Sequence, residues 1–222
     1  MRTEIVFSSG DRIAVIAPHP DDESLGASSV LLLAPERTDI FVLTDGSHGC
    51  RDRTVEEEAA VRRRQFEAEM DYVKPNSFEW IGVEDTKLGL HPEAVGKIDF
   101  TPYTIIFLPW LNSLHPDHRD AARFCLDEIR RQRARADCYF YEIDAPFHDP
   151  SHYIDISEIA EEKRRLVRFH ADQKGHEQIT LALNAYRAAQ MIKYKSLEYV
   201  EAFQKVDADE HPELPDQDRK EI

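Results

Sequence analysis

Short, uninterrupted apolar segments constrain the fold of this chain more than any other feature of its sequence. The segments 12–17, 39–43 and 104–109 consist mostly of β-branched and other apolar residues. Segments of this length and composition are typical of strands that are buried on both faces of a parallel sheet. Helices must cover both sides of such a sheet, so the rest of the chain should supply them.

Helical patterns alternate with these strands. Thr54 and Glu57 have the spacing of a capping box, which predicts the start of a charged, exposed helix. Ser157 is a candidate N-cap for a later helix. The predicted strands cover residues 12–17, 39–43, 78–81, 104–109, 138–143 and 153–156, and the predicted helices cover 22–33, 54–73, 116–133, 157–173 and 179–203. This alternation predicts an α/β fold, a Rossmann-like three-layer domain with a mostly parallel central sheet flanked by helices. We expect a single domain over residues 1–205 and an acidic, flexible tail over 206–222.

The charge balance narrows the class of partner. The 222 residues include 43 acidic and 28 basic side chains, which gives a formal charge of −15. A nucleic-acid-binding protein needs a basic surface to displace counterions, so we expect no nucleic-acid partner. The same sign argues against an anionic membrane surface. We also predict no transmembrane segment, because the apolar stretches are far shorter than the ~20 residues that a spanning helix requires.

The cysteines and the N-terminal residues predict a cytoplasmic location. Cys50, Cys125 and Cys138 are odd in number and form no CxxC pair, which favours neither a disulfide framework nor a thiolate zinc site. Residues 1–4 show no signal-peptide pattern. The sequence does not determine the oligomeric state, and a homo-oligomer stays an open alternative.

His-Pro pairs are more frequent than composition predicts. With 10 His and 12 Pro in 222 residues, chance placement gives about half of one such pair. The chain has four, and two of them continue with aspartate, at 19–23 and 115–118. Both follow a predicted buried strand directly. Ligands bind in the crevice at the carboxyl ends of parallel strands, so the two clusters can converge on one point.

Imidazole and carboxylate groups together suit a catalytic zinc ion, which takes three protein ligands and leaves one position for water. His19, Asp22 and His118 would supply such a set, and bound zinc lowers the pKa of its water towards ~7. Asp21 is adjacent and could accept the proton of that water. For either cluster alone, a plain structural role is an equal alternative: the acidic residues 21–23 would complement a helix dipole, and the histidines would face solvent.

In these two segments the sequence resembles a known family, the LmbE-like or PIG-L (GlcNAc-PI de-N-acetylase) zinc deacetylases. The family fingerprint is a (P/A)HPDDE segment after the first strand and an HPDH segment about a hundred residues later, and residues 18–23 and 115–118 match both without a change. The likeness continues through 44–49, 82–88 and 199–203 and covers roughly residues 10 to 205. The paired motifs are far more specific than a single glycine-rich loop.

The resemblance implies a role for each matched residue. His19, Asp22 and His118 are the expected metal ligands for Zn²⁺, with Fe²⁺ or another divalent metal as alternatives. Asp21 is the expected general base. The resemblance further implies that His115 stabilises the oxyanion and protonates the leaving amine, and that Asp117 orients a histidine. The implied reaction is hydrolysis of an N-acetylglucosamine-type acetamide to acetate and a free amine.

The resemblance is less direct for the residues that are expected to contact the substrate. Arg62 matches the arginine of a family R-x-x-E helix motif, although Arg64 with Glu67 fits the spacing too, and an arginine run on a helix can simply be solvated. Asp85 matches an aspartate that binds sugar hydroxyls, with a loop-capping role as an equal alternative. The family's turn glutamate is replaced by Ser47, and its H-x-S-Q segment reads His-Ala-Asp-Gln at 170–173. Both departures concern the identity of the substrate.

Two further functions compete with the sugar deacetylase. One is a zinc amidase that acts on a non-sugar N-acyl compound or a thiol conjugate. The other is a binding protein that keeps the fold without turnover, which would be expected to lack a ligand or the base. A nucleotide-binding oxidoreductase is weaker, because no G-x-G-x-x-G segment follows the first strand. We therefore expect a small-molecule partner, an N-acetylamino sugar or glycoconjugate.

Overall fold

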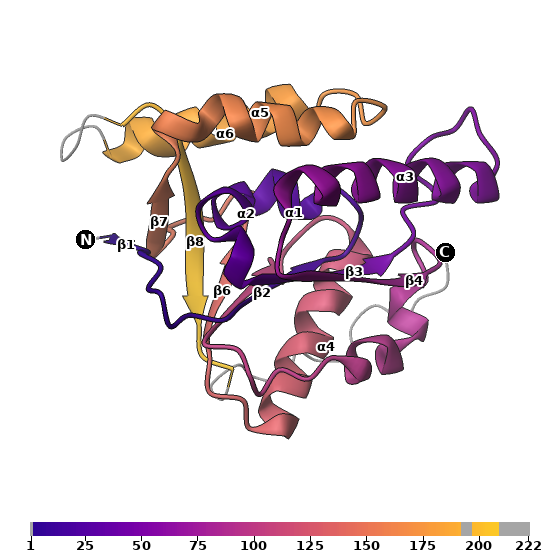
Figure 1. Ribbon diagram of the computed structural model, residues 1–222, viewed down its shortest axis with the longest axis horizontal. Coiled ribbons are helices and arrows are strands. Elements are labelled where there is room, and N and C mark those ends of the chain that lie inside the picture. The colour runs from indigo at the N-terminus through magenta and orange to yellow at the C-terminus, as the bar shows by residue number, and fades with distance from the viewer. Residues whose placement is uncertain (1, 192–196, 209–222) are drawn as a thin grey trace.

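The computed structural model describes residues 2–191 and 197–208 and places one eight-stranded sheet at the centre of the protein (Figure 1). The strand order is β1-β7-β8-β6-β5-β2-β3-β4. Neighbouring strands are parallel except where β8 pairs antiparallel with β6 and β7. The strands are β1 Thr3–Glu4, β2 Ile13–Ala17, β3 Thr38–Thr44, β4 Ser77–Val83, β5 Ile105–Pro109, β6 Asp137–Tyr141, β7 His152–Asp155 and β8 Val200–Val206.

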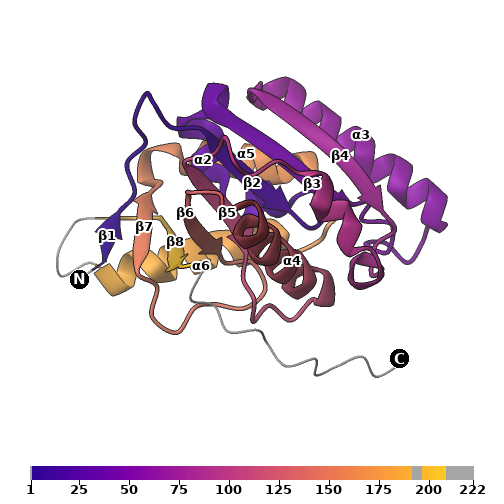
Figure 2. The same ribbon diagram turned by 90° about the horizontal axis from the view of Figure 1, so that it is seen from below.

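Helices cover both faces of this sheet. The α-helices are α1 Asp22–Gly26, α2 Ser28–Leu33, α3 Val55–Val73, α4 Pro116–Gln132, α5 Ala160–Phe169 and α6 His176–Met191, and short 3-10 helices cover Pro35–Arg37, Leu88–Leu90, Pro92–Lys97 and Ser157–Ile159. Figure 1 shows α1, α2, α3, α5 and α6 above the sheet and α4 below it. Figure 2 looks onto the α4 side, with β1 and β4 at opposite edges of the sheet. The predicted α/β class with a mostly parallel, helix-covered sheet is confirmed.

The central strand β2 shows why the apolar segments fold as they do. All five of its residues are buried. Ala14 and Ile16 pack into the core on the α4 side, whereas Ile13, Val15 and Ala17 pack into the core beneath the other helices. Side chains alternate between the faces of a strand, so a strand buried on both faces needs a continuous apolar run.

Local signals position the two long helices near the site. The capping box of α3 is present as predicted: Thr54 Oγ1 accepts from the backbone N of Glu57 at 3.2 Å, and the Glu57 carboxylate accepts from the backbone N of Thr54 at 3.0 Å. At α4, Pro116 occupies the first turn, where its missing N–H costs nothing. The ring of His115 caps that helix by accepting from the backbone N of Asp117.

Two predicted elements are wrong in detail. The prediction of a helix over 179–203 is wrong at its C-terminal end, because Val200 and the residues after it form β8, which pairs with β6 on one side and β7 on the other; α6 is described over His176–Met191, and residues 192–196 lie outside the described residues. The predicted cap at Ser157 is also wrong, because α5 begins at Ala160 after a 3-10 turn and ends at Phe169. Ser157 instead donates to Asp155 at 2.6 Å and accepts from the backbone N of Glu198 at 2.9 Å.

The predicted domain boundary stays a prediction. One sheet contains both β1 and β8, which ends at Val206. Most of the predicted tail, from residue 209 onward, lies outside the described residues. Across the part of the chain that the structure describes, no helix is long and apolar enough to cross a membrane.

Candidate active site

The site lies where the chain reverses its winding direction across the sheet. From β2, the sheet continues to β3 on one side and to β5 on the other. The helix that follows β2, α1, lies above the sheet, and the helix that follows β5, α4, lies below it (Figure 1). Ligands of α/β proteins bind at such a switch point, and both His-Pro-Asp segments lie there, at the ends of the adjacent strands β2 and β5; we refer to this junction as the crevice.

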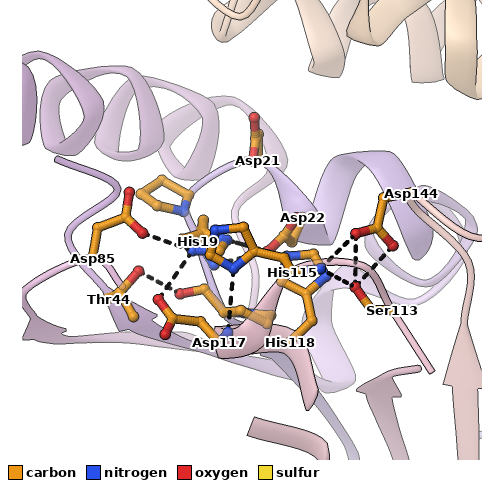
Figure 3. Close-up of polar contacts among 12 residues, drawn as sticks. His19, Asp21, Asp22, Thr44, Asp85, Ser113, His115, Asp117, His118 and Asp144 are labelled. Carbon is orange, nitrogen blue, oxygen red and sulfur yellow. Dashed lines mark hydrogen bonds and ion pairs between the residues drawn. The ribbon is translucent and has the colours of Figure 1, made fainter. Parts of the chain in front are cut away.

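The three predicted metal ligands come together there (Figure 3). His19 Nδ1 lies 3.1 Å from His118 Nε2. Asp22 Oδ2 lies 3.3 Å from His19 Nδ1 and 3.2 Å from His118 Nε2. All three side chains are buried. The two histidines are 99 positions apart in the sequence, and the pairing of their strands brings them together.

This triangle of atoms fits a metal ion. Three ligand atoms bound tetrahedrally at ~2.0–2.2 Å to one ion lie about 3.3–3.5 Å from one another, close to the distances seen here. The electrostatics agree with the distances. Burial opposes the charge on Asp22, yet His118 and His19 hold its pKa well below the ordinary value. Burial opposes protonation of His19, yet hydrogen bonds with Asp117, Asp22 and Asp85 raise its pKa well above the ordinary value. The carboxylates of Asp22, Asp85 and Asp117 thus favour positive charge at the position of His19.

Two carboxylates determine which nitrogen of His19 is free for a metal. His19 Nε2 lies 3.1 Å from Asp85 Oδ1 and 3.4 Å from Asp117 Oδ2. A carboxylate accepts, so Nε2 carries a proton, and Nδ1 is the nitrogen that would present its lone pair to a metal ion at the triangle. Asp117 is itself held by the backbone N of Thr86 at 2.7 Å and of Leu88 at 3.3 Å. Carboxylates that orient a ligating histidine in this way also raise its basicity.

His115 lies beside the ligands without forming part of the triangle. Its ring centroid is 4.5 Å from that of His19 and 5.4 Å from that of His118. Its Nδ1 accepts from the backbone N of Asp117 at 3.2 Å, so the neutral ring carries its proton on Nε2. Burial, and then repulsion from His19 and His118, lower its pKa. A neutral ring with Nε2–H can donate a hydrogen bond to an oxygen that gains negative charge.

Sequence analysis missed the residue that holds the loop before His115. The Asp144 carboxylate accepts from Ser113 Oγ at 2.8 Å, from the backbone N of Leu114 at 3.0 Å and from the backbone N of His115 at 3.1 Å (Figure 3). Asp144 follows β6, which neighbours β5 in the sheet. No motif includes it, and only the pairing of those strands brings it to this loop.

Asp21 has an unusual backbone and two partners. Its φ of 113° and ψ of −23° place it in the left-handed region, where a residue with a side chain is strained. The Glu23 carboxylate accepts from its backbone N at 3.2 Å. Its own Oδ1 lies 3.1 Å from Arg62 Nη2, and its Oδ2 lies 3.1 Å from His176 Nδ1. Burial raises the pKa of Asp21, but Arg62 and His176 outweigh it and hold this pKa below the ordinary value.

The predicted substrate residues differ in their burial and in the contacts that they make within the chain. Arg62 is buried beside Asp21, whereas Arg64 is exposed on the other side of α3. Two donor atoms of Arg62, Nε and Nη1, are buried without a hydrogen-bond partner among the described residues. Asp85 is buried, and its Oδ2 accepts from the backbone N of His48 at 3.0 Å. Its contact with sugar hydroxyls stays a prediction.

A second buried cluster lies behind Asp21, which sequence analysis did not identify. It joins three groups whose candidate ligand atoms lie within 4.8 Å of one another, namely Glu23, Glu69 and His170. His170 Nε2 is 2.7 Å from Glu69 Oε2. Burial, followed by repulsion from Glu69 and Asp21, raises the pKa of Glu23 well above its ordinary value. This cluster connects α1, the helix that begins directly after Asp21, to α3.

Comparisons with known proteins agree with this geometry. Residues 14–129 match the PIG-L family, described as GlcNAc-PI de-N-acetylase. The diacetylchitobiose deacetylase of Thermococcus kodakarensis is 31% identical over 198 residues, which cover 75% of this chain and 72% of that relative. The matched family segment contains both His-Pro-Asp motifs.

Solved structures extend the likeness to the whole fold. The N,N'-diacetylchitobiose deacetylase from Pyrococcus horikoshii has a TM-score of 0.76 at 18% identity and covers 90% of this chain and 85% of its own. GalB, the 4-carboxy-2-hydroxymuconate hydratase from Pseudomonas putida, has a TM-score of 0.70 at 14% identity over 91% of this chain and 98% of its own. At such identities the likeness concerns the fold alone, and the two names denote different reactions. The fold therefore accommodates different reactions, and the residues of the site determine which one occurs.

Proposed function

The chain belongs to the GlcNAc-PI de-N-acetylase (PIG-L) family, and we propose that it hydrolyses the acetamide of an N-acetylglucosamine-type sugar at a metal held by His19, Asp22 and His118. Membership rests on the family match over residues 14–129 and on the 31% identical deacetylase. The observation that carries the proposal is the triangle of ligand atoms with sides of 3.1, 3.2 and 3.3 Å. The enzyme is thus a hydrolase of an amide bond.

The donor set supports zinc as the metal. Two imidazole nitrogens and one carboxylate oxygen form a three-ligand set of the catalytic zinc type, with a position left for water. Imidazole and carboxylate also suit Fe²⁺, so metal analysis must decide between the two ions. When bound, such an ion polarises the acetyl carbonyl and makes its water more acidic.

The chain's own residues supply the proton transfers. Asp21 accepts a proton from the attacking water, since each of its oxygens keeps a second lone pair beside its contact with Arg62 or His176. The water oxygen bonds to the acetyl carbon, and the C–N bond then breaks to leave acetate and an amine. His115 donates a hydrogen bond from Nε2 to the carbonyl oxygen as negative charge develops there. The proton that Asp21 takes from the water passes on to the departing nitrogen, which leaves Asp21 ionised again.

Arg62 and Asp85 are the proposed substrate contacts. The buried, unpartnered Nε and Nη1 of Arg62 are donors suited to sugar hydroxyl or carbonyl oxygens. Asp85 has one oxygen on His19 and one on His48, so we propose that it orients His19 first and meets the sugar only through a remaining lone pair. Loss of Asp85 should therefore weaken both metal and substrate binding.

A substrate panel tests the proposed reaction. Purified enzyme is stripped with a chelator, reloaded with Zn²⁺ or with Fe²⁺ under anaerobic conditions, and assayed for acetate release. The panel contains N-acetylglucosamine, N,N'-diacetylchitobiose, an N-acetylated amino acid and an N-acetylated thiol conjugate. We expect acetate from a sugar and only from the metal-loaded enzyme. Acetate from the non-sugar compounds alone would contradict the sugar specificity and support the amidase alternative.

The cytoplasm remains our proposed location. All three cysteines, Cys50, Cys125 and Cys138, are free thiols in the structure. Free thiols are typical of a reducing compartment, and burial raises the pKa of Cys138 to about 12. Fractionation of cells that express the protein, with a cytoplasmic marker enzyme followed in parallel, checks this location.

A further inference from the structure

We propose that His176 is a positioning residue for the hydrolysis, which holds the second carboxylate oxygen of Asp21 and so fixes the plane of the general base. This inference rests on the proposed role of Asp21. His176 lies 155 positions after Asp21 and belongs to neither His-Pro-Asp motif. It is the first residue of α6, which lies in the helical layer above the sheet (Figure 1).

The two oxygens of Asp21 have different partners from different helices. Arg62 of α3 holds Oδ1 at 3.1 Å, and His176 of α6 holds Oδ2 at 3.1 Å. A carboxylate held at one oxygen can still rotate about its Cβ–Cγ bond, because the terminal torsion of an aspartate is broad. Partners on both oxygens stop that rotation. Arg62 alone would therefore leave the plane of the Asp21 carboxylate free to rotate about this bond.

The direction of the hydrogen bond follows from the chemistry. An ionised carboxylate only accepts, so Nδ1 of His176 must carry the proton. The hydrogen bond with Asp21 is the largest effect on the pKa of His176 and raises it. Burial acts in the opposite direction but is the smaller effect. The charged groups that act on this imidazole are Asp21, Asp22 and Arg62. The Asp21 side chain is 4% exposed and that of His176 is 37% exposed, so the pair connects the buried carboxylate to a side chain that reaches the surface.

The helix that carries His176 is fixed relative to the helix that follows Asp21. Thr180 Oγ1 donates to the backbone O of Leu25 in α1 at 3.0 Å. Residues four apart lie on one face of a helix, so His176 and Thr180 both face α1. Further along α6, Asn184 Nδ2 donates to the backbone O of Val200 at 3.0 Å. These contacts hold the His176 backbone in place, and the ring can therefore act as a rigid support.

The main chain of Asp21 is already held, so the side chain is the remaining freedom. Its backbone N donates to the Glu23 carboxylate in the strained left-handed conformation. A displacement of about 1 Å in a catalytic group can lower a rate about 100-fold. Loss of His176 should thus reduce turnover while it leaves the three metal ligands and the substrate contacts of Arg62 intact.

Two substitutions at position 176 separate positioning from a general structural role. His176→Asn places its amide nitrogen where Nδ1 lies and keeps a donor for Asp21, whereas His176→Ala removes the donor. We expect His176→Ala to lower kcat about 10- to 100-fold with KM changed less than about 3-fold, and His176→Asn to restore kcat to within about 3-fold of wild type. His91→Asn, a half-exposed histidine paired with Glu93 away from the site, is the control and should leave kcat unchanged.

Metal content and thermal midpoint are measured on each variant and should match the wild type. Equal kcat in His176→Ala and the wild type would overturn the proposal. So would a His176→Asn variant as slow as His176→Ala, or a loss of metal from His176→Ala.

An NMR titration makes failure of this inference distinguishable from failure of the proposed function. The ring pKa of His176 is measured in the apo-protein and in Asp21→Asn, and we expect it to fall in the variant because the carboxylate is lost. An unchanged pKa would overturn the contact whether or not any substrate is hydrolysed. If the wild type releases no acetate from the panel while this pKa falls, the contact holds and the proposed function is wrong.

Discussion

At the scale of single residues, the side chains of Asp21 and Asp22 are adjacent in the chain but have different partners. Asp22 faces His19 and His118, while its neighbour Asp21 faces Arg62 and His176. In Figure 3, Asp21 lies above the histidine cluster and no contact drawn there reaches it. The left-handed φ of Asp21 produces this divergence, because it turns two consecutive carboxylates in different directions. The two residues should therefore respond differently to substitution.

Asp21→Asn tests the base. The amide keeps the shape of the carboxylate but cannot accept a proton from water, so we expect kcat to fall about 100- to 10,000-fold. The three ligand atoms are untouched, and the bound metal per protein should stay at the wild-type value in elemental analysis. Wild-type turnover in this variant would contradict the role of Asp21.

His118→Ala tests the ligand set by the opposite signature. It removes one corner of the triangle formed with His19 Nδ1 and Asp22 Oδ2. We expect the metal content after dialysis to fall well below that of the wild type, together with the activity. His91→Ala, at an exposed position, is the matched control. Full metal occupancy in His118→Ala would contradict ligation.

At the scale of elements, the site depends on how the ends of two adjacent strands are finished. β2 and β5 pair in parallel with Val15 opposite Phe107, so their following segments meet. One of these segments turns into α1 at the strained Asp21, and the other enters α4 through the proline at its first turn. Between β5 and α4, Asp144 collects the loop that presents His115.

Asp144→Ala tests this loop support. The substitution leaves Ser113 Oγ and the backbone N–H groups of Leu114 and His115 without their charged acceptor. Asp144 is exposed, so water can replace much of what its carboxylate supplies, and we expect the free energy of unfolding to fall by about 1 kcal/mol. Displacement of His115 should also lower kcat.

The control for this variant is Asp149→Ala, an exposed aspartate a few residues along that pairs with Arg2 at the surface. It should change neither stability nor kcat, as measured by urea unfolding and by acetate release. Equal stability of Asp144→Ala and Asp149→Ala would show that the loop is held in another way.

At the scale of the whole molecule, a buried ion pair joins the helical layer to the sheet. The Glu201 carboxylate of β8 accepts from the backbone N and Oγ of Ser28 and of Ser29, at 2.6 to 3.1 Å, and from Lys163 Nζ of α5 at 2.7 Å. Lys163 also donates to the backbone O of Leu25 at 2.8 Å. One carboxylate thus fastens α1, α2 and α5 to β8, and the elements around the crevice depend on it.

Glu201→Leu tests this connection. It leaves the ammonium of Lys163 buried without its counter-charge, which costs about 3–5 kcal/mol, so the thermal midpoint should fall sharply. The double variant Lys163→Met, Glu201→Leu should recover the part of that loss that comes from the buried charge, while the donors of Ser28 and Ser29 stay without their acceptor.

A surface pair of the same length provides the control. Lys205 Nζ lies 2.7 Å from Asp137 Oδ1, as Lys163 does from Glu201, but its side chains are 44% and 55% exposed. Asp137→Leu should change the free energy of unfolding by at most about 1 kcal/mol. Equal losses from the buried and the exposed pair would contradict the importance of burial.

Local sequence was sufficient to predict the parts of the fold and site whose determinants lie close together in the chain. A continuous apolar run predicted β2 because only burial on both faces tolerates it. Thr54 and Glu57 predicted the start of α3 because a capping box is complete within four residues. The His-Pro-Asp segments predicted that two strand ends lie together, since each follows directly from a buried strand, and the ligand set of His19, Asp22 and His118 stays a prediction.

The tertiary structure decided what depends on residues far apart. β8 is a strand despite its helical apolar spacing, because β6 and β7 offer it hydrogen bonds on both sides. His176 reaches Asp21 across 155 positions, and Asp144 reaches His115 across 29. Hydrogen bonds of this kind leave no periodicity or spacing in the sequence, because they depend on which helices and strands pack together. The sequence by itself determined the buried strands and the two His-Pro-Asp segments at their ends, and the packing of the layers decided how Asp21 and its neighbours are held.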